Sequence, residues 1–248
     1  MDELRTIRIR FKMTDLEQQL REDLAASHHV VYHYGWDDLL ATHLSVRIPQ
    51  SNAVLITPHN VPFEEVSAEN LVKVDLNGRV LSQNSYTVMP QAFNIHAEIY
   101  KASSSIHSAM HTHSTYGVAV SSLKSGLLFC NQQALRFYND VAYHDYNGLA
   151  LANEGHEIVQ SLQDKKVMIL RNHGLLTTGK TIYEALYLLY YLEKVCELQI
   201  KLQSVNDSLI ELDESVCLKT KAQFERILTP EKEFAVLKRR VQYLSQNK

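Results

Sequence analysis

Apolar residues recur at helical spacing near the start of the chain and predict a long helix that runs to about Tyr34. Thr14 and Glu17 have the spacing of a capping box, so we expect this helix to begin at Thr14. The apolar stripe that defines the helix consists of Leu16, Leu20, Leu24 and Val31.

Short apolar runs separated by turn residues predict β-strands through the middle of the chain. Asn77-Gly78 predicts a tight hairpin turn between two of them. The expected strands are Leu44–Ile48, Ala53–Thr57, Val72–Asp75, Val80–Leu81, Ser108–His113, Val141–Asp145, Val167–Arg171 and Leu175–Thr178.

Helices are expected between and after these strands. The clearest begins at Thr181, which forms a second capping box with Glu184, and runs to about Gln203. Two more helices close the chain, and Thr229 with Pro230 marks the start of the last one. The shorter helices are expected over Phe93–Ser103, Val118–Leu123 and Gly155–Leu162. The closing helices offer an apolar face made of Phe224, Ile227, Phe234, Leu237, Val241 and Leu244. Alternating helices and strands indicate a sheet covered on both faces, an α/β/α domain.

Composition narrows the function classes. The 248 residues are 45% hydrophobic and 21% charged, as in ordinary globular proteins, and no sequence repeat is present. The longest apolar run, Ala185 to Leu192, is far shorter than the roughly 18 to 20 residues that a membrane span needs. The net charge of −3 gives no electrostatic reason to expect nucleic acid or a membrane as partner. Three widely spaced cysteines favour a reducing cytoplasm.

His111-Thr112-His113 is the sharpest chemical signal in the sequence. Residues i and i+2 of a strand project from one face, so both imidazoles would point into the same space. His173 lies in a tight turn directly after another apolar strand. Three neutral imidazoles around a divalent ion leave coordination positions open, which is typical of a catalytic metal site. A turn or surface role for each histidine is the plainer alternative.

Other histidines carry weaker signals. His28, His29 and His33 fit a solvated helix face better than a metal site. His144 is either a pocket residue or a hydrogen-bonded core histidine.

Five motifs together resemble the class II aldolase/adducin family, over about Leu16 to Gln203. The segments Gln133-Ala134-Leu135 and 141–148 are similar to its adducin-like branch. The five motifs are Gly35-Trp36 with His43-Leu44-Ser45-Val46-Arg47, Leu55-Ile56-Thr57-Pro58, Ile95-His96-Ala97-Glu98-Ile99-Tyr100, Met110-His111-Thr112-His113-Ser114, and Ile169-Leu170-Arg171-Asn172-His173-Gly174-Leu175.

The resemblance implies one domain over residues 1–248, with a core of about 14–204 and a helical extension of about 205–248. It implies a three-layer α/β/α fold with a nine-stranded, mostly antiparallel sheet, assembled as a homotetramer with active sites at subunit interfaces. It also implies a divalent metal, zinc in many members and here manganese or iron as alternatives, on His111, His113 and His173.

Three positions depart from the pattern of the family's sugar-phosphate aldolases. Ala92 replaces their general-base glutamate, and Gln132 falls near their proton-donating tyrosine. Thr42-His43 replaces their phosphate-binding Gly-Asn turn. These differences argue against an ordinary sugar-phosphate aldolase.

Two functions from different classes remain open. The first is a metal-dependent lyase for a small hydroxy-carbonyl or carboxylate substrate, acting by retro-aldol cleavage or decarboxylation. His96 is then the candidate for proton transfer, with Tyr143 and His144 as candidate substrate-binding residues. The second is a non-catalytic, adducin-like oligomerisation or cytoskeletal-binding domain. Three converging histidines favour the enzyme, whereas the lost glutamate and tyrosine favour the scaffold.

Overall fold

The computed structural model describes residues 15–149 and 154–246. The predicted elements appear in the expected order, with ends that differ by a few residues. The strands are β1 (His43–Arg47), β2 (Ala53–Ile56), β3 (Val72–Asp75), β4 (Ser108–Thr112), β5 (Val141–His144), β6 (Val167–Leu170) and β7 (Gly174–Gly179). The helices are α1 (Asp15–His33), α2 (Pro90–Ala102), α3 (Thr115–Ser121), α4 (Glu154–Leu162), α5 (Ile182–Gln203), α6 (Glu214–Ile227) and α7 (Pro230–Gln246), with 3₁₀ turns η1 (Phe63–Glu65) and η2 (Ala134–Phe137).

One sheet of seven strands, in the order β3-β2-β1-β4-β7-β6-β5, forms the centre of the described part of the chain. Every neighbouring pair is antiparallel except β5 and β6, which are parallel. The fold class is therefore confirmed as mixed α/β with a mostly antiparallel sheet. The nine strands implied by the resemblance are not all present in the described residues. The strand expected over Val80–Leu81 is reduced to a single bridge between Val74 and Val80.

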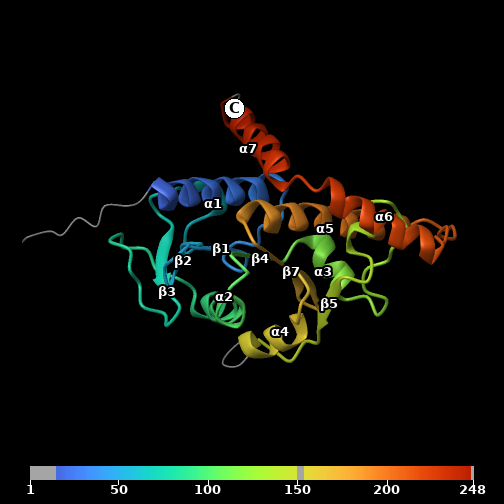
Figure 1. Ribbon diagram of the computed structural model, residues 1–248, viewed down its shortest axis with the longest axis horizontal. Helices are drawn as coiled ribbons and strands as arrows, with labels where there is room; N and C mark the ends of the chain where they lie inside the picture. Colours follow the sequence, from blue (N-terminus) through green and yellow to red (C-terminus); the bar gives the residue numbers. More distant parts are fainter. Residues whose placement is uncertain (1–14, 150–153, 247–248) are drawn as a thin grey trace, which may run out of the picture.

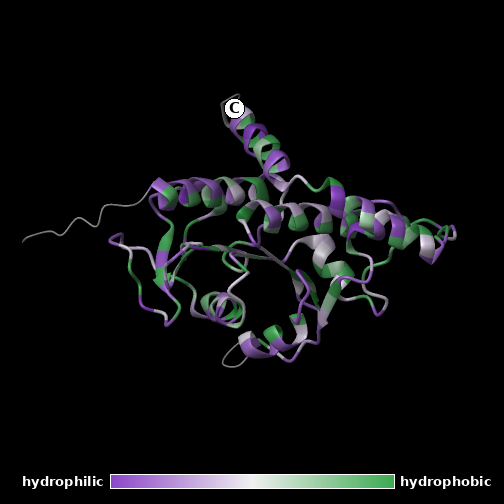
Figure 2. Ribbon diagram, viewed as in Figure 1, coloured by the Kyte–Doolittle hydropathy of each residue, from purple (hydrophilic) through white to green (hydrophobic). Residues whose placement is uncertain are grey.

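Helices cover both faces of this sheet, as Figure 1 shows, with α1 and α5 on one side and α2 and α4 on the other. Strand β2 illustrates the result, because Leu55 packs into the core under α1 and α5 while Val54 and Ile56 pack into the core under α2 and α4. All four residues of β2 are buried. In Figure 2 helices α1 and α7 alternate between hydrophilic and hydrophobic colours, as expected for helices with one buried face.

Capping residues set several helix ends. Thr181 accepts a hydrogen bond from the backbone N–H of Glu184 and begins α5, as predicted. Helix α3 begins at Thr115, earlier than predicted, because the Ser114 side chain caps it by accepting from the Gly117 N–H. Helix α2 also begins earlier, at Pro90, a residue type suited to the first turn. The predicted cap residue Thr14 lies outside the described residues.

The two C-terminal helices bury only part of their predicted apolar face. Phe234 and Leu237 of α7 pack into the core beneath α1 and α5. Ile227 at the end of α6 is 67% exposed, and Leu244 near the end of α7 is also exposed. Figure 1 shows that α7 projects away from the rest of the molecule toward its C-terminal end.

Within the described residues, no helix has both the length and the apolar character needed to cross a membrane.

Candidate metal centre

Strand register places two histidines side by side at the centre of the sheet. His43 of β1 pairs directly with His111 of β4, and their ring centroids are 4.9 Å apart. Side chains of directly opposed residues project from the same face of a sheet. Residue i+2 on β4 lies on that face too, so His113, just past the end of the strand, joins His111.

His173 reaches the same place through the tight turn between β6 and β7. Asn172 has a left-handed backbone, with φ of 56°, which an asparagine tolerates better than most residues. Gly174 follows, and a Cβ at that position would collide with the carbonyl oxygen of Thr112. This close approach of β7 to β4 brings the His173 ring to within 4.8 Å of the His111 ring, measured between centroids.

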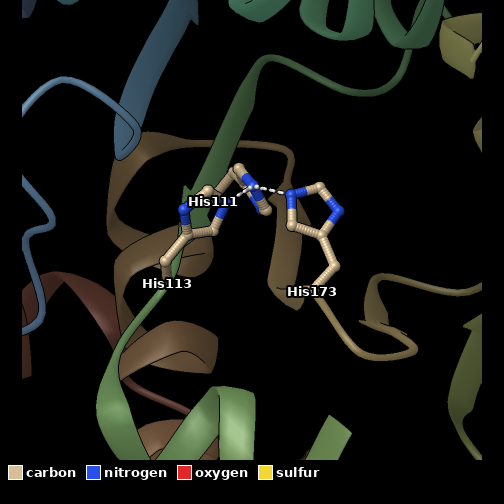
Figure 3. Close-up of side chains that lie close together, drawn as sticks. All are labelled: His111, His113 and His173. Carbon is tan, nitrogen blue, oxygen red and sulfur yellow. Dashed lines mark hydrogen bonds between the residues drawn. The ribbon is translucent and has the colours of Figure 1, made fainter. Parts of the chain in front are cut away.

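The three histidines present the same nitrogen atom to a common point, as Figure 3 shows. The Nε2 atom of His111 lies 2.7 Å from Nε2 of His113 and 3.2 Å from Nε2 of His173. All three ligand atoms lie within 4.8 Å of one another. No other group of three or more potential metal ligands is this close in the part of the chain that the structure describes.

Hydrogen bonds on the opposite side of two rings fix their tautomers. Nδ1 of His111 donates to the carbonyl oxygen of Leu175 at 2.8 Å. Nδ1 of His113 donates to the carboxylate of Asp38, with a nitrogen–oxygen distance of 3.3 Å. A proton on Nδ1 leaves the Nε2 lone pair of a neutral imidazole free for a cation, and such partners are typical of metal-binding histidines.

Burial keeps these imidazoles neutral. Removal from water lowers the pKa of His111 well below its usual value, and it lowers the pKa of His173 to about 4. Removal from water also lowers the pKa of His113, although Asp38 opposes the change. Neutral imidazole is the form that binds metal, so little proton release would accompany binding at neutral pH.

This donor set fits a divalent ion. Two imidazole nitrogens on one tetrahedral zinc ion, each about 2.0–2.1 Å from it, lie about 3.3 Å apart. The separation of 3.2 Å between His111 and His173 is close to that value, and the 2.7 Å between His111 and His113 is shorter. Three protein nitrogens fill three coordination positions, which leaves at least one for substrate or water.

The remaining predicted site residues are His96, Tyr143 and His144. His96 is 0% exposed and lies behind His43, so the structure does not place it beside His111, His113 and His173. The Tyr143 hydroxyl accepts the backbone N–H of Leu127 at 3.0 Å.

His144 is also held by a neighbour. It is nearly buried, and its Nδ1 atom lies 2.9 Å from the Ser161 hydroxyl. Burial lowers its pKa. This arrangement is that of the hydrogen-bonded core histidine, one of the two alternatives for this residue.

The positions that depart from the aldolase pattern provide no carboxylate or phenol in the described structure. Ala92 is buried and lines a small cavity together with Thr42 and His43. Gln132 is exposed.

The solvated-face interpretation was wrong for His28. This residue is 0% exposed, with Nδ1 2.8 Å from the Leu24 carbonyl oxygen and Nε2 2.8 Å from the Thr57 hydroxyl. His29 is partly buried against the Val66 carbonyl, whereas His33 is exposed. The helix periodicity did not reveal this, because the polar side chain is covered by a 3₁₀ turn distant in sequence, whose Phe63 packs on the His28 ring.

Four residues near the triad were not identified as functional from the sequence. Asp38 binds His113, and His43 faces His111. Tyr146 lies edge-on to His173 with centroids 6.5 Å apart and is half exposed. Glu193 of α5 accepts hydrogen bonds from Thr112 and Ser114. The one sequence signal for these residues was the alternation of polar residues in β1, and the same pattern is typical of an ordinary strand with one face toward solvent.

Comparison with known proteins agrees with this architecture. Residues 22–200 match the family model described as Class II Aldolase and Adducin N-terminal domain. A putative aldolase class 2 protein of Caulobacter vibrioides is 42% identical over 204 residues, which cover 82% of this chain and 79% of the relative. Mouse alpha-adducin is 37% identical over 205 residues, which cover 79% of this chain but 28% of the adducin.

Solved structures show the same relationship. An aldolase II superfamily protein from Pseudomonas syringae superposes with a TM-score of 0.89 at 35% identity, covering 94% of this chain and 95% of the other. L-fuculose 1-phosphate aldolase from Glaciozyma antarctica superposes with a TM-score of 0.83 at 30% identity, covering 93% and 91%. The chain therefore belongs to the class II aldolase and adducin N-terminal domain family.

Proposed function

We propose that the protein is a divalent-metal-dependent lyase for a small hydroxy-carbonyl or carboxylate substrate, which it cleaves by retro-aldol reaction or decarboxylation. The observation that carries this proposal is the convergence of three Nε2 atoms from His111, His113 and His173. Zinc is the proposed metal, with manganese or iron as alternatives.

Each residue of the site has a proposed role. His111, His113 and His173 would hold the ion, while Leu175 and Asp38 keep two of the rings in the required tautomer. A bound divalent ion would supply Lewis acidity that stabilises negative charge on a substrate oxygen next to the carbon that reacts. Tyr146, which is half exposed and lies edge-on to His173, is a candidate to contact the substrate.

The residues available for proton transfer favour decarboxylation over aldol cleavage. Ala92 has no titratable group, and His96 is fully buried behind His43. Loss of CO₂ leaves an electron pair on the substrate without prior removal of a proton, so the missing base matters less. His96 remains a proposal as a proton-transfer residue, and unchanged turnover in His96→Ala would remove it from the mechanism.

A non-catalytic, adducin-like role is the second candidate. The identity to mouse alpha-adducin, 37%, is only slightly below the 42% identity to the putative aldolase of Caulobacter vibrioides. A scaffold, however, has no need for three imidazoles with their lone pairs directed at one point. The absence of a bound metal under all conditions would favour this second candidate.

The proposal extends to assembly and location. A homotetramer is proposed from the family, with substrate bound near a subunit interface, and light scattering that shows a monomer at micromolar concentration would contradict it. A cytoplasmic location is proposed from the three free cysteines Cys130, Cys196 and Cys217.

Elemental analysis of protein purified without chelator or a histidine tag tests the function directly. We expect about one equivalent of metal per chain, lost in His111→Ala/His113→Ala. The matched control is His107→Ala/His156→Ala, which removes two imidazoles outside the triad and should retain the metal. A screen of hydroxy-ketones, aldehydes, β-keto acids and hydroxy acids then follows. No metal after reconstitution with each ion would overturn the enzyme proposal.

A further inference from the structure

A buried chain of hydrogen bonds leads from helix α2 to the ring of His43. The Tyr100 hydroxyl lies 2.6 Å from the Ser45 hydroxyl, which contacts Nδ1 of His96. Nε2 of His96 lies 2.6 Å from Nδ1 of His43. Tyr100, Ser45 and His96 are each at most 1% exposed, and His43 is 6% exposed. The four side chains therefore form a continuous polar path through a desolvated part of the core.

Strand and helix geometry explain why these residues meet. His43 and Ser45 are two positions apart on β1 and share the face that α2 covers. His96 and Tyr100 are four positions apart on α2, so they share one face of that helix. Ala109, a residue with a small side chain, pairs with Ser45 across the sheet.

The hydrogen bonds along this path all run in one direction, from Tyr100 toward His43. A buried hydroxyl proton needs an acceptor, and Ser45 is the only side-chain acceptor for Tyr100 in the described residues. Tyr100 therefore donates to Ser45, and Ser45 donates in turn to Nδ1 of His96. Neutral His96 then carries its proton on Nε2 and donates it to Nδ1 of His43.

It follows that neutral His43 carries its own proton on Nε2. His43 is buried between the rings of His96 and His111, a position that favours the uncharged imidazole. The small cavity next to Ala92 is lined in part by His43. Nε2 lies across the ring from Nδ1, so the N–H group points away from His96. The ring that carries it lies 4.9 Å from the ring of His111, between centroids, and so beside the triad.

We propose that His43 is a hydrogen-bond donor to a substrate oxygen beside the triad, held in its Nε2–H tautomer by the chain from Tyr100 through Ser45 and His96. The substrate is a small molecule with an oxygen that gains negative charge during the reaction, and this part of the proposal rests on the proposed function. The tautomer itself follows from the protein alone.

This assignment gives His43 and His96 different roles. A preorganised neutral N–H group stabilises charge as it develops on oxygen, and it does so without solvent reorganisation. His43, with its lone pair committed to His96, cannot remove a proton from the substrate. The assignment also replaces the proton-transfer role proposed above for His96: this residue acts through His43, as a positioning residue, because its Nε2–H group sets the tautomer of His43.

Nuclear magnetic resonance of protein labelled with ¹⁵N-histidine tests the tautomer without any metal or substrate. Long-range ¹H–¹⁵N correlation should show His43 with its proton on Nε2, with the signal identified by its loss in His43→Gln. In Ser45→Ala, His96 loses the donor to its Nδ1 atom, so the Nδ1–H form of His43 should appear. A proton on Nδ1 of His43 in the unmodified protein would overturn the proposal.

Binding of acetohydroxamate to zinc-loaded protein tests the donor role, because this probe offers two oxygens and a negative charge to the metal. We expect His43→Leu to weaken binding about 10- to 100-fold, the effect of one hydrogen bond to a charged group. His43→Gln keeps an N–H donor and should recover most of the affinity. His107→Leu, at the far end of β4, is the control that leaves affinity unchanged.

The outcomes separate the two proposals. If the unmodified protein binds no zinc, the proposed function fails, and the tautomer measurement still decides whether His43 is a donor. If zinc content is retained in every variant and His43→Leu binds the probe as tightly as the unmodified protein, the donor role fails while the metal site stands. An equal loss of acetohydroxamate affinity in His43→Gln and His43→Leu would also contradict the donor role.

Discussion

Glu193 accepts a hydrogen bond from Thr112, the residue between His111 and His113, at 2.6 Å. Its second oxygen accepts from Ser114, so one carboxylate of α5 holds the residues on either side of His113. Glu193 is 2% exposed, and burial raises its pKa to about 7. The end of β4, next to the proposed metal ligands His111 and His113, is therefore fixed by a buried acidic side chain from the opposite layer.

Glu193→Gln should destabilise the fold by about 1–3 kcal/mol, the cost of an unsatisfied buried polar group. A glutamine has one acceptor oxygen, and its NH₂ group would face the Ser114 hydroxyl, which already accepts from the Gly117 N–H. Urea unfolding measures the change. The control is Glu197→Gln on the same helix, whose lysine partners lie at the surface, so its effect should be small. Equal stability of both variants would contradict this structural role of Glu193.

Asp38→Asn should weaken zinc binding about 10- to 100-fold, as changes to the partners of metal-ligating histidines typically do. The Asp38 carboxylate accepts the Nδ1–H of His113 and so keeps Nε2 free for the ion. Competition with a chromophoric chelator measures the affinity. Asp37→Asn, the neighbouring position, is the matched control, and an unchanged affinity in Asp38→Asn would show that this contact does not support the metal.

Acid should destabilise the protein through its buried histidines. Burial lowers the pKa of His28 to about 3 in the folded state, below the ordinary value of 6.5. Between these two pH values the unfolded chain binds the extra proton, so the free energy of unfolding falls as pH falls. Each such histidine contributes about 1.4 kcal/mol per pH unit in that window.

His28→Gln should reduce this slope by about that amount between roughly pH 4 and 6, because glutamine does not titrate. Its amide retains a donor for the Leu24 carbonyl and a partner for Thr57. Urea unfolding at several pH values gives the slope. The control is His33→Gln, which changes an exposed histidine of the same helix and should leave the slope unchanged. A similar slope in the unmodified protein, His28→Gln and His33→Gln would refute the role of His28 in acid destabilisation.

Arg136→Ala should loosen helix α6. The guanidinium lies between the rings of Tyr191 and Phe224, with its central carbon 3.8 Å from each centroid, and Nε donates to the Tyr187 hydroxyl. Loss of these contacts, worth about 1 kcal/mol, should speed local amide exchange in residues 214–227 about fivefold. Lys219→Ala, on the exposed side of α6, is the control. Exchange at the same rate in both variants would show that Arg136 does not anchor this helix.

Local signals predicted the elements well because each depends on neighbours in the chain. The helix from Thr181 begins at its predicted cap, since the Thr181 hydroxyl and the Glu184 N–H are three residues apart. His111 and His113 share a face for a similar reason, the twofold repeat of a strand. The apolar face of α7 was only partly buried, because periodicity marks a face but does not say what will cover it.

Polar residues that alternate in a strand were the main source of error. His43, Ser45 and Arg47 have the pattern of a solvent-facing edge, yet α2 covers this row and supplies His96 and Tyr100 as partners. That helix was predicted but its position over β1 was not, so His43 gave no sign of a role. His28 was misjudged in the same way, because its partner Thr57 lies in another element.

The sequence alone determined the fold class, the family and two histidines directed to the same side of one strand, because these follow from periodicity and from motifs within short segments. His173 was predicted as the third ligand, but its convergence with the other two, the donor direction of His43 and the hydrogen bonds of Glu193 were decided by tertiary structure. Each depends on strand register or on a helix that packs across the sheet, and these bring together side chains such as His43 and His96 that are far apart in the chain.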